Sequence, residues 1–268
     1  MVNILITGGT SGIGKKLSEH LAKNNVVIIC GNNKNNILKM KKKQNILSYQ
    51  CDVSNLKSVI KFSKSLKRKI KKIDVIINCA GTYGNIGKFY NLSFSQWKKA
   101  IEINFFGVFL ISKYFLNFLE KSKIKKIINF AGGGAFNAFP NYSSYATSKS
   151  AVVRFTETIA EELKSKKISV NCVAPGFVAT NIHKKTIKSG FKKAGNKFYF
   201  ETMKKIKTGG TPYQKIIDCL NFLISKKSKS LTGKTISVTF DKWNTTIFQK
   251  KISQINSSDA LTMRRINL

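Results

Sequence analysis

The feature that most constrains this chain is a run of glycines near its start, between an apolar segment and a helical one. Residues 2–6 read VNILI, a short apolar strand, and residues 7–14 read TGGTSGIG; apolar residues at helical spacing then follow from Leu17 to Ala22. Glycines let a backbone turn tightly and approach a pyrophosphate, and a helix N-terminus offers free N–H groups to it. Strand, glycine turn and helix in this order predict a dinucleotide site, and an ordinary glycine-rich turn is the less favoured alternative. The residues expected to contact the dinucleotide here are Gly8, Thr10, Ser11, Gly12, Ile13 and Gly14.

The alternation of strands and helices along the chain predicts the fold class. At 268 residues the chain can bury a core on both faces of a sheet. The predicted strands are continuous apolar runs, which is typical of a parallel sheet covered on both faces. They lie over 2–6, 26–30, 46–51, 74–78, 126–130, 168–173 and 235–239. We therefore expect one α/β domain over residues 1–240, with a doubly wound parallel sheet of about seven strands.

Two later regions are harder to interpret. Residues 177–210 are polar, basic and without clear pattern, and we expect them to form an irregular lid. Residues 241–268 show no clear periodicity, and we expect a tail that packs on the same domain.

The formal charge of +36 suggests nucleic acid or an anionic membrane as a partner. Only four of the 48 basic residues are arginine, however, and the lysines are spread over nearly every predicted helix and loop. No nucleic-acid motif accompanies the charge, so the interpretation favours a compositional bias over a nucleic-acid function.

Hydrophobicity and cysteine usage indicate the compartment. The sequence contains no run of 18 or more apolar residues, which disfavours a membrane span. The first strand begins at residue 2 and leaves no room for a signal peptide, so we expect a cytoplasmic protein. The cysteines lack metal-ligand spacing, which predicts reduced thiols and no metal site. They are Cys30, Cys51, Cys79, Cys172 and Cys219.

The loop after the second strand, residues 31–36, faces the adenosine ribose in a dinucleotide fold. No acidic side chain stands there to accept hydrogen bonds from the ribose 2′-hydroxyl. Asn32 and Asn33 can bond a hydroxyl or a 2′-phosphate, and Lys34 can reach a phosphate. This favours NADP(H) slightly over NAD(H). After the third strand come Asp52 and Val53, and Asp52 is either a partner for the adenine amino group or a solvated loop acid.

Residues beyond the other strands complete the candidate site. Asn78, Cys79, Ala80 and Gly81 end the fourth strand, where small side chains let the backbone lie against a flat ring. A long predicted helix over 95–121 carries Asn104 in its middle, although asparagine is a poor interior helix residue. Further along, the chain reads YSSYATSK over residues 142–149 and APGFVAT over residues 174–180.

Taken in order, these motifs resemble the short-chain dehydrogenase/reductase family over about residues 1–240. The resemblance implies a Rossmann fold and an NAD(P)-dependent oxidoreductase that transfers a hydride between nicotinamide and an alcohol or carbonyl. Such chemistry needs a general acid/base beside the nicotinamide. By resemblance this group is Tyr145, Lys149 bonds the nicotinamide ribose, and Asn104 holds a water that relays protons. Lys149 lies one helical turn from Tyr145, so its ammonium is expected to lower the tyrosine pKa. Further cofactor contacts implied are Asn78, Ala80, Gly81, Tyr145, Lys149, Pro175, Gly176, Val178 and Thr180, the last at the carboxamide.

One departure from the family pattern bears on activity. In the family a serine shortly before the tyrosine bonds the substrate oxygen, whereas residues 130–135 here read FAGGGA. Loss of one such donor typically costs about 10² to 10³ in rate. Backbone N–H groups of the glycines, or Ser143, are candidate replacements. The alternative function is therefore a catalytically weakened member that serves as a cofactor-binding or regulatory subunit.

Charge and surface patterning suggest a substrate class and an assembly. Lysines in the lid predict an anionic substrate, such as a phosphorylated or nucleotide-linked sugar, although the chain-wide lysine bias is the favoured alternative. The basic residues named for this are His183, Lys184, Lys185, Lys188, Lys192, Lys193 and Lys197. The predicted helices over 95–121 and 149–164 carry more apolar residues than one buried face needs. Related proteins commonly pair through these helices, so we expect a homo-oligomer, either a dimer or a tetramer.

Overall fold

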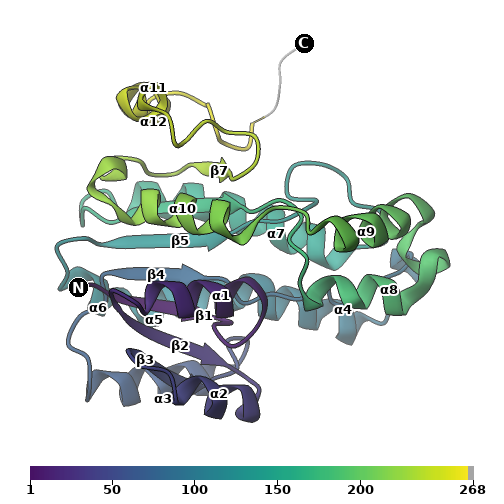
Figure 1. The fold of residues 1–268 in the computed structure, drawn as a ribbon, viewed down its shortest axis with the longest axis horizontal. Helices are drawn as coiled ribbons and strands as arrows, with labels where there is room; N and C mark the ends of the chain where they lie inside the picture. The colour runs from purple at the N-terminus through teal and green to yellow at the C-terminus, as the bar shows by residue number, and fades with distance from the viewer. Residues whose placement is uncertain (265–268) are drawn as a thin grey trace.

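The computed structural model describes residues 1–264 and is built around a seven-stranded parallel sheet (Figure 1). The strand order is β3-β2-β1-β4-β5-β6-β7, so the chain reverses its direction of travel across the sheet between β1 and β4. Every neighbouring pair is parallel, and the predicted fold class is confirmed. The strands are β1 (Asn3–Thr7), β2 (Val26–Gly31), β3 (Ile46–Gln50), β4 (Val75–Asn78), β5 (Lys126–Phe130), β6 (Ser169–Ala174) and β7 (Thr235–Ser237).

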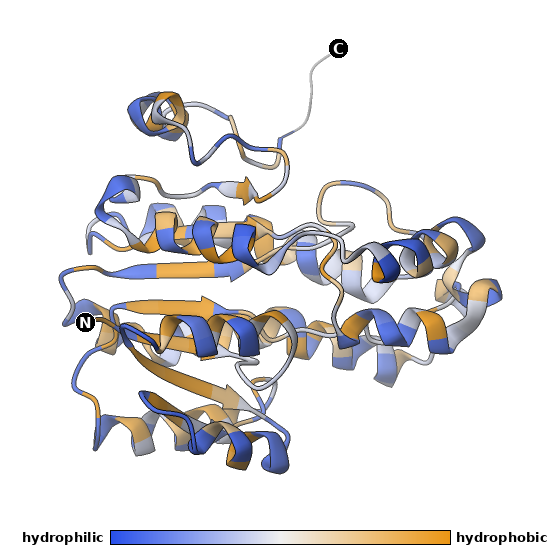
Figure 2. Cartoon of the chain, viewed as in Figure 1, coloured by the Kyte–Doolittle hydropathy of each residue, from blue (hydrophilic) through white to orange (hydrophobic). Residues whose placement is uncertain are grey.

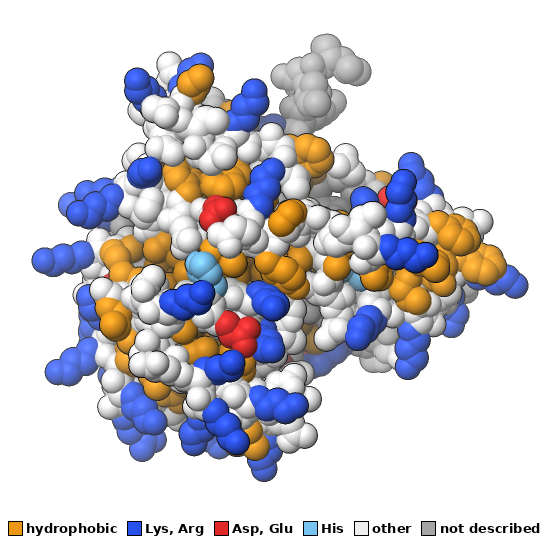
Figure 3. Space-filling model, in the orientation of Figure 1, with side chains coloured by type: hydrophobic (Ala, Val, Ile, Leu, Met, Phe, Trp, Pro, Cys, Tyr) orange, Lys and Arg blue, Asp and Glu red, His pale blue; other side chains and the backbone are white. Residues whose placement is uncertain are grey.

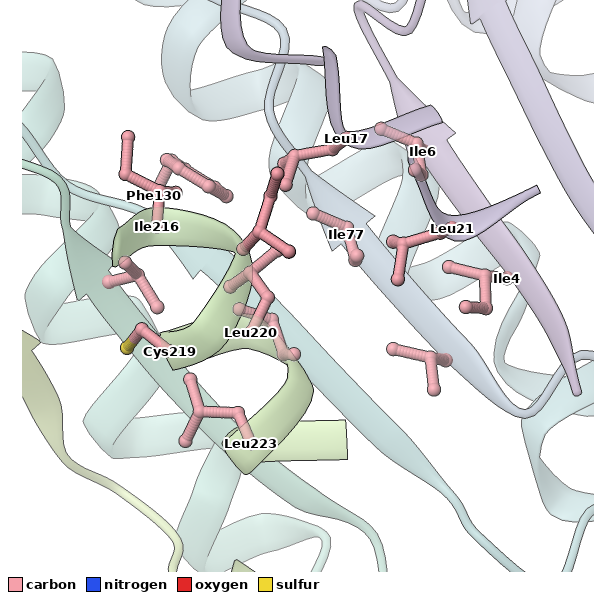
Figure 4. Close-up of a cluster of buried hydrophobic side chains, with 14 of the residues drawn as sticks. Ile4, Ile6, Leu17, Leu21, Ile77, Phe130, Ile216, Cys219, Leu220 and Leu223 are labelled. Carbon is pink, nitrogen blue, oxygen red and sulfur yellow. The ribbon is translucent and has the colours of Figure 1, made fainter. Parts of the chain in front are cut away.

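Helices cover both faces of the sheet, which explains why the central strands carry apolar side chains on both of their faces (Figure 2). On one face, α1 (Gly12–Leu21) and α10 (Tyr213–Ile224) pack against Ile4, Ile6 and Ile77 (Figure 4). On the other face, α3 (Leu56–Lys67) and α5 (Gly107–Tyr114) supply side chains to a second core that contains Leu5 and Ile76. The other long helices are α2 (Lys34–Lys41), α4 (Phe94–Ile101), α7 (Ser143–Glu162), α8 (Asn181–Ala194) and α9 (Asn196–Thr208).

The long helix predicted over 95–121 is interrupted in the structure. A π-helical turn at Glu102–Phe106 joins α4 to α5, and α6 (Leu116–Glu120) begins after a break at Phe115. The π turn contains Asn104, whose side chain bonds the backbone of Thr82 from both its amide nitrogen and its oxygen. Single π-helical turns inside helices are frequently found at functional sites, and the π turn at Asn104 fits this association.

The region expected to be an irregular lid is helical, and that expectation was wrong. Residues 181–208 form α8 and α9, which project from one end of the molecule (Figure 1). Glycines punctuate the segment, since Gly190 bends α8 at φ 73° and Gly195 joins the two helices at φ 84°. These positive φ values suit glycine, and the polar surface of both helices hid their periodicity.

The C-terminal segment contacts the body of the protein through both side chains and backbone groups. Trp243 and Ile252 are buried in the core beneath α10, and two short helices are present, α11 (Thr246–Lys250) and α12 (Ile252–Asn256). The backbone N–H of Met263 donates to Glu157 on α7 at 2.6 Å. The last four residues of the predicted tail, 265–268, lie outside the described residues. Among residues 1–264, every helix is too short or too polar to cross a lipid bilayer.

Candidate active site

A cavity of about 1000 Å³ runs along the carboxyl ends of the strands. Residues from the ends of β1, β2, β4, β5 and β6 line it, so it lies at the point where the strand order reverses. Open α/β sheets bind ligands at this position because loops diverge there to leave a crevice. The predicted cofactor contacts line the cavity except for Asn78 and for Asn33 and Lys34, the two alternatives to Asn32 in the loop after β2.

One end of the cavity is built mainly from backbone. A methyl group at Gly14 would lie 2.4 Å from the carbonyl oxygen of Gly8, and one at Gly8 would lie 2.9 Å from the Cα of Ala80. Within the described chain, Ser11 at the N-cap of α1 makes no side-chain cap hydrogen bond, so the first-turn N–H groups stay open to a ligand. Thr180 at the start of α8 packs beside Gly12, 3.6 Å from a Cβ placed there. This cradle fits a pyrophosphate.

The adenosine side of the cavity is lined by Asn32, Asp52 and Val53. Asn33 is used differently, because its side chain accepts the backbone N–H of Asn36 at 2.9 Å and caps α2. Lys34 is exposed and lies outside the cavity lining. Asp52 accepts hydrogen bonds from the N–H and hydroxyl of Ser54, and the cap of α3 is therefore Asn55 rather than Ser54.

Tyr145 and Lys149 lie together on α7 at the other end of the cavity. Both are buried, with 7% and 5% of their surface exposed, and Lys149 Nζ lies 5.8 Å from the Tyr145 ring centroid. The Lys149 ammonium donates to the carbonyl oxygen of Phe130 at 2.8 Å. The i and i+4 spacing thus places both groups on one face of α7, as predicted from the helix period.

Burial dominates the protonation of this pair. It raises the pKa of Tyr145 above its ordinary value and lowers the pKa of Lys149, although Cys172 and Cys79 partly oppose the second shift. We expected Lys149 to lower the tyrosine pKa, and the structure shows the opposite direction because desolvation disfavours the phenolate. Tyr145 is therefore protonated at neutral pH and ready to donate a proton.

Asn104 is fully buried and lies outside the cavity lining. Its amide nitrogen donates to Thr82 O and to Ser148 Oγ, each at 2.9 Å, and its oxygen accepts the N–H of Thr82 at 2.8 Å. A methyl group at Gly81 would lie 3.4 Å from Asn104 Oδ1 and 3.7 Å from Lys149 Nζ. The asparagine thus lies close to the lysine and ties the loop after β4 to α7.

Asn78 at the end of β4 also points away from the cavity. Its amide donates to Asn129 Oδ1 at 2.8 Å and to Ser112 Oγ at 3.2 Å. Both partners lie inside the protein, and Asn78 itself is 2% exposed. In this structure its contacts tie β4 to β5 and α5.

Gly132 lies in the stretch before Tyr145 where the family serine is expected, and the Tyr145 hydroxyl occupies the space that a side chain at Gly132 would take. A Cβ placed on Gly132 would lie 2.1 Å from the hydroxyl of Tyr145, so this glycine makes room for that group. Gly132 and Gly133 line the cavity, whereas Ser143 lies outside the lining and accepts a hydrogen bond from Trp97 Nε1 at 3.0 Å. Of the two candidate replacements, only the glycine run faces the cavity.

An aromatic wall stands beside Tyr145 that was not predicted from the sequence. The Tyr83 ring meets the Tyr145 ring edge-on at 4.7 Å, and its hydroxyl lies 3.1 Å from His183 Nδ1. His183 stacks on Phe177 at 3.9 Å. Burial lowers the pKa of His183 to about 4, so this residue is uncharged at neutral pH and is not part of the positive charge expected in the lid. The available signal was that His183 is one of only two histidines in the chain.

Few of the lid lysines reach the cavity. Of those predicted to attract a substrate, only Lys185 lines it, and its ammonium donates to Thr82 Oγ1 at 2.9 Å. Lys205, which the prediction omitted, also lines the cavity and lies 5.7 Å above the Phe177 ring. The positive charge at the substrate end is thus smaller than the sequence suggested.

Comparison with known proteins identifies the family, since the model for short chain dehydrogenases matches residues 2–189. The chain belongs to the short chain dehydrogenase family. The 3-oxoacyl-[acyl-carrier-protein] reductase FabG of Buchnera aphidicola subsp. Schizaphis graminum is 29% identical over 87% of this chain and 94% of that protein. An NAD-dependent glycerol dehydrogenase of Listeria innocua is 27% identical over 87% of this chain and 91% of that protein.

Solved structures show the same fold. An actinorhodin polyketide ketoreductase with NADPH matches with a TM-score of 0.78 at 24% identity, covering 88% of this chain and 95% of that one. The ligand-free aldohexose dehydrogenase of Thermoplasma acidophilum matches with a TM-score of 0.76 at 24% identity, covering 88% and 92%. As a short chain dehydrogenase, this chain is an NAD(P)-dependent oxidoreductase by family.

Proposed function

We propose that this short chain dehydrogenase interconverts an alcohol and a carbonyl compound with Tyr145 as the general acid/base. The observation that carries the proposal is the continuity of one cavity, which has a glycine cradle at one end and the Tyr145 and Lys149 pair at the other. Carbonyl reduction needs a proton donor at the substrate oxygen. Tyr145 supplies one that is protonated at neutral pH.

The backbone-built end is proposed to hold the cofactor. The glycine turn and the N-terminus of α1 would take the pyrophosphate, Asn32 the ribose, and Thr180 the carboxamide. The bound nicotinamide supplies or accepts the hydride. We propose a slight preference for NADP(H), because no acidic side chain follows β2 in the sequence to select a free 2′-hydroxyl.

The chain's own groups handle the proton. In reduction the Tyr145 hydroxyl donates its proton to the substrate oxygen, and in oxidation the phenolate takes a proton from the alcohol. Lys149 is the nearby cation that favours the phenolate when it forms, and Asn104 is proposed to hold a relay water between this lysine and solvent. Asn104 Oδ1 and Lys149 Nζ both lie beside Gly81, and this supports the proposed role of Asn104.

The substrate end of the cavity favours a carbonyl compound whose body can pack against aromatic side chains. Tyr83, Phe139, Phe177 and Phe198 line it, and Lys185 and Lys205 stand among them. The relatives include reductases of 3-oxoacyl groups and a glycerol dehydrogenase, so both ketone and polyol substrates merit testing. The two lysines support an anionic substrate, including a phosphorylated sugar.

The test is turnover of purified protein with panels of ketones and alcohols, followed at the nicotinamide absorbance band. We expect activity in the wild type and its loss in Tyr145→Phe, with Tyr90→Phe, an exposed tyrosine outside the cavity lining, as the matched control. Activity that survives Tyr145→Phe would overturn the assignment.

The anionic substrate has a separate test. The value of kcat/KM should fall as salt is added, and it should also fall in the Lys185→Gln and Lys205→Gln double variant.

A second candidate function, a weakened cofactor-binding or regulatory subunit, is favoured by the missing serine. Gly132→Ala and Gly132→Ser both place a Cβ 2.1 Å from the Tyr145 hydroxyl, so comparing them isolates the added hydroxyl. For an intact enzyme, both variants should lose activity to a similar degree. A large gain in turnover for Gly132→Ser alone would establish the weakened subunit.

We also propose a cytoplasmic homo-oligomer. Phe106 and Phe109, around the junction of the π turn and α5, are 45% and 40% exposed, which is consistent with a helix face that pairs with another copy. Light scattering at micromolar concentration should show a dimer or tetramer, and a monomer throughout would contradict the assembly. The described cysteines are free thiols, which fits a reducing compartment.

A further inference from the structure

The helical lid carries apolar side chains on its outer surface. Phe191 on α8 and Phe200 on α9 are 45% and 59% exposed, and their rings stack with centroids 6.5 Å apart. Met203, close to one helical turn after Phe200, is 39% exposed. We call these three residues the lid patch. Figure 3 shows hydrophobic side chains gathered on this projecting part of the molecule, and exposed clusters of this kind mark binding surfaces.

Lysines surround the lid patch. Residues 181–210 contain nine lysines and a single acidic residue, Glu201, and all nine lysines are exposed. On α9, Lys204 and Lys207 share the helix face of Phe200, because residues four and seven apart lie on one side of a helix. On α8, Lys192 and Lys193 directly follow Phe191. Apolar rings flanked by lysines are typical of helices that lie in the surface of an anionic membrane.

We propose that α8 and α9 dock on an anionic phospholipid surface. The lid patch enters the boundary between headgroups and acyl chains, and the flanking lysines meet the lipid phosphates while their stems cover apolar surface. A second copy of the chain does not fit this face, because each lid would bring the seven lysines that lie outside the cavity lining against the same seven. Single-stranded nucleic acid is a poorer match, since it binds in basic grooves with stacking rings. This surface projects from the molecule (Figure 3), and it includes the exposed, non-aromatic Met203.

The lid's position gives the docking a consequence for access to the cavity. The inward side of the same two helices lines the cavity through Ile182, His183 and Lys185 of α8 and Phe198 and Lys205 of α9. A membrane bound to the outer side therefore sits beside the substrate end. The docking itself does not depend on the proposed reaction, because the lid patch is separate from the residues that line the cavity.

The test is cosedimentation of the full chain with vesicles of phosphatidylcholine alone and with vesicles that also contain phosphatidylglycerol. We expect binding only to the second kind, weakened by salt. The double variant Lys192→Gln/Lys193→Gln should reduce affinity about tenfold or more, since one lysine near an anionic surface contributes about fivefold. The double variant Phe191→Ser/Phe200→Ser should also reduce affinity about tenfold or more, because it removes the apolar rings that enter the lipid. Circular dichroism of each variant shows whether the fold is kept.

Matched controls separate the lid from the overall charge. Lys61→Gln/Lys64→Gln on α3 makes the same charge change, and Leu38→Ser/Ile247→Ser removes two exposed apolar side chains elsewhere; both should bind vesicles like the wild type. An equal loss in the α3 control, or no loss in the phenylalanine pair, would overturn the proposal. Lid-dependent binding to a single-stranded oligonucleotide without binding to vesicles would also overturn it.

Discussion

The two ends of the cavity are built in different ways. At the cofactor end, glycines, helix N–H groups and strand termini shape the site, and a single added methyl group would lie 2.4 Å from a backbone oxygen. At the substrate end, side chains from distant segments form the wall, as with Tyr83 and His183, which are 100 residues apart. The first end has a fixed shape set by backbone geometry, whereas the second can be altered by exchanging side chains. This difference predicts how each end responds to substitution.

The largest effect on cofactor affinity is expected at the cofactor end. Gly14→Ala pushes a Cβ against the carbonyl of Gly8, and the turn must shift to relieve it. Losing one backbone hydrogen bond to the charged pyrophosphate costs about 1.5–3 kcal/mol, so NADPH affinity should fall by about 10²-fold in a fluorescence titration. Gly133→Ala is the matched control, because its Cβ meets Phe139 at an ordinary 3.6 Å and should leave affinity unchanged. Equal affinities in all three proteins would show that the backbone does not define this end.

Loss of one hydroxyl should weaken the substrate end without affecting the cofactor. Tyr83→Phe removes the partner of His183 Nδ1 in a buried setting, which typically costs about 1–3 kcal/mol of folding free energy. Denaturant titration measures this loss, and NADPH affinity should remain that of the wild type. Tyr90→Phe, an exposed tyrosine, should change neither quantity. A parallel loss of NADPH affinity in Tyr83→Phe would mean that the two ends are not separable.

Acid should destabilise the substrate end through His183. The folded-state pKa of His183 is about 4, below its ordinary value of 6.5, so the unfolded chain binds more protons between these values. The resulting stability is fully present above about pH 6.5 and falls by about 2 kcal/mol on going to pH 5. Thermal or denaturant unfolding across this range measures the effect. His183→Gln should remove this part of the pH dependence and His20→Gln should keep it; an unchanged profile in His183→Gln would contradict the assignment.

The smallest effect is expected at the edge of the cofactor end, where a side chain rather than the backbone contacts the ligand. Asn32→Asp places a carboxylate after β2 that accepts hydrogen bonds from a free ribose and repels a 2′-phosphate. The ratio of kcat/KM for NADH over NADPH should rise by about tenfold, the size of one hydrogen bond. Asn36→Asp, in the first turn of α2 and outside the cavity lining, is the control. A ratio unmoved by Asn32→Asp would show that the ribose lies elsewhere.

The same contrast explains what the sequence could predict. The cofactor end follows from contiguous motifs, because strand, glycine turn and helix are local in sequence. Tyr145 and Lys149 share a helix face for the same reason. The aromatic wall could not be predicted, since the contact between Tyr83 and His183 depends on how α8 packs against the loop after β4. The helices of the lid were missed because their exposed lysines and phenylalanines blur the usual apolar stripe.

Some local details depended on competition between neighbouring groups. Ser54 and Asn55 both stand at the start of α3, but Asp52 takes the Ser54 hydroxyl and Asn55 is the cap. The direction of the Tyr145 pKa shift depended on burial, which the spacing of two residues cannot reveal. The role of Gly132 becomes clear only in the folded structure, where a Cβ at this position would collide with the Tyr145 hydroxyl.

The central claim is that one cavity separates cofactor binding from proton transfer, and Tyr145→Phe tests it most directly. NADPH affinity and the rate of nicotinamide oxidation should be measured on the same preparation, with the best substrate from the panels. We predict an affinity equal to that of the wild type and a rate lower by about 10² to 10⁴, the usual contribution of a positioned acid. A variant that binds NADPH and oxidises it at the wild-type rate would contradict the account.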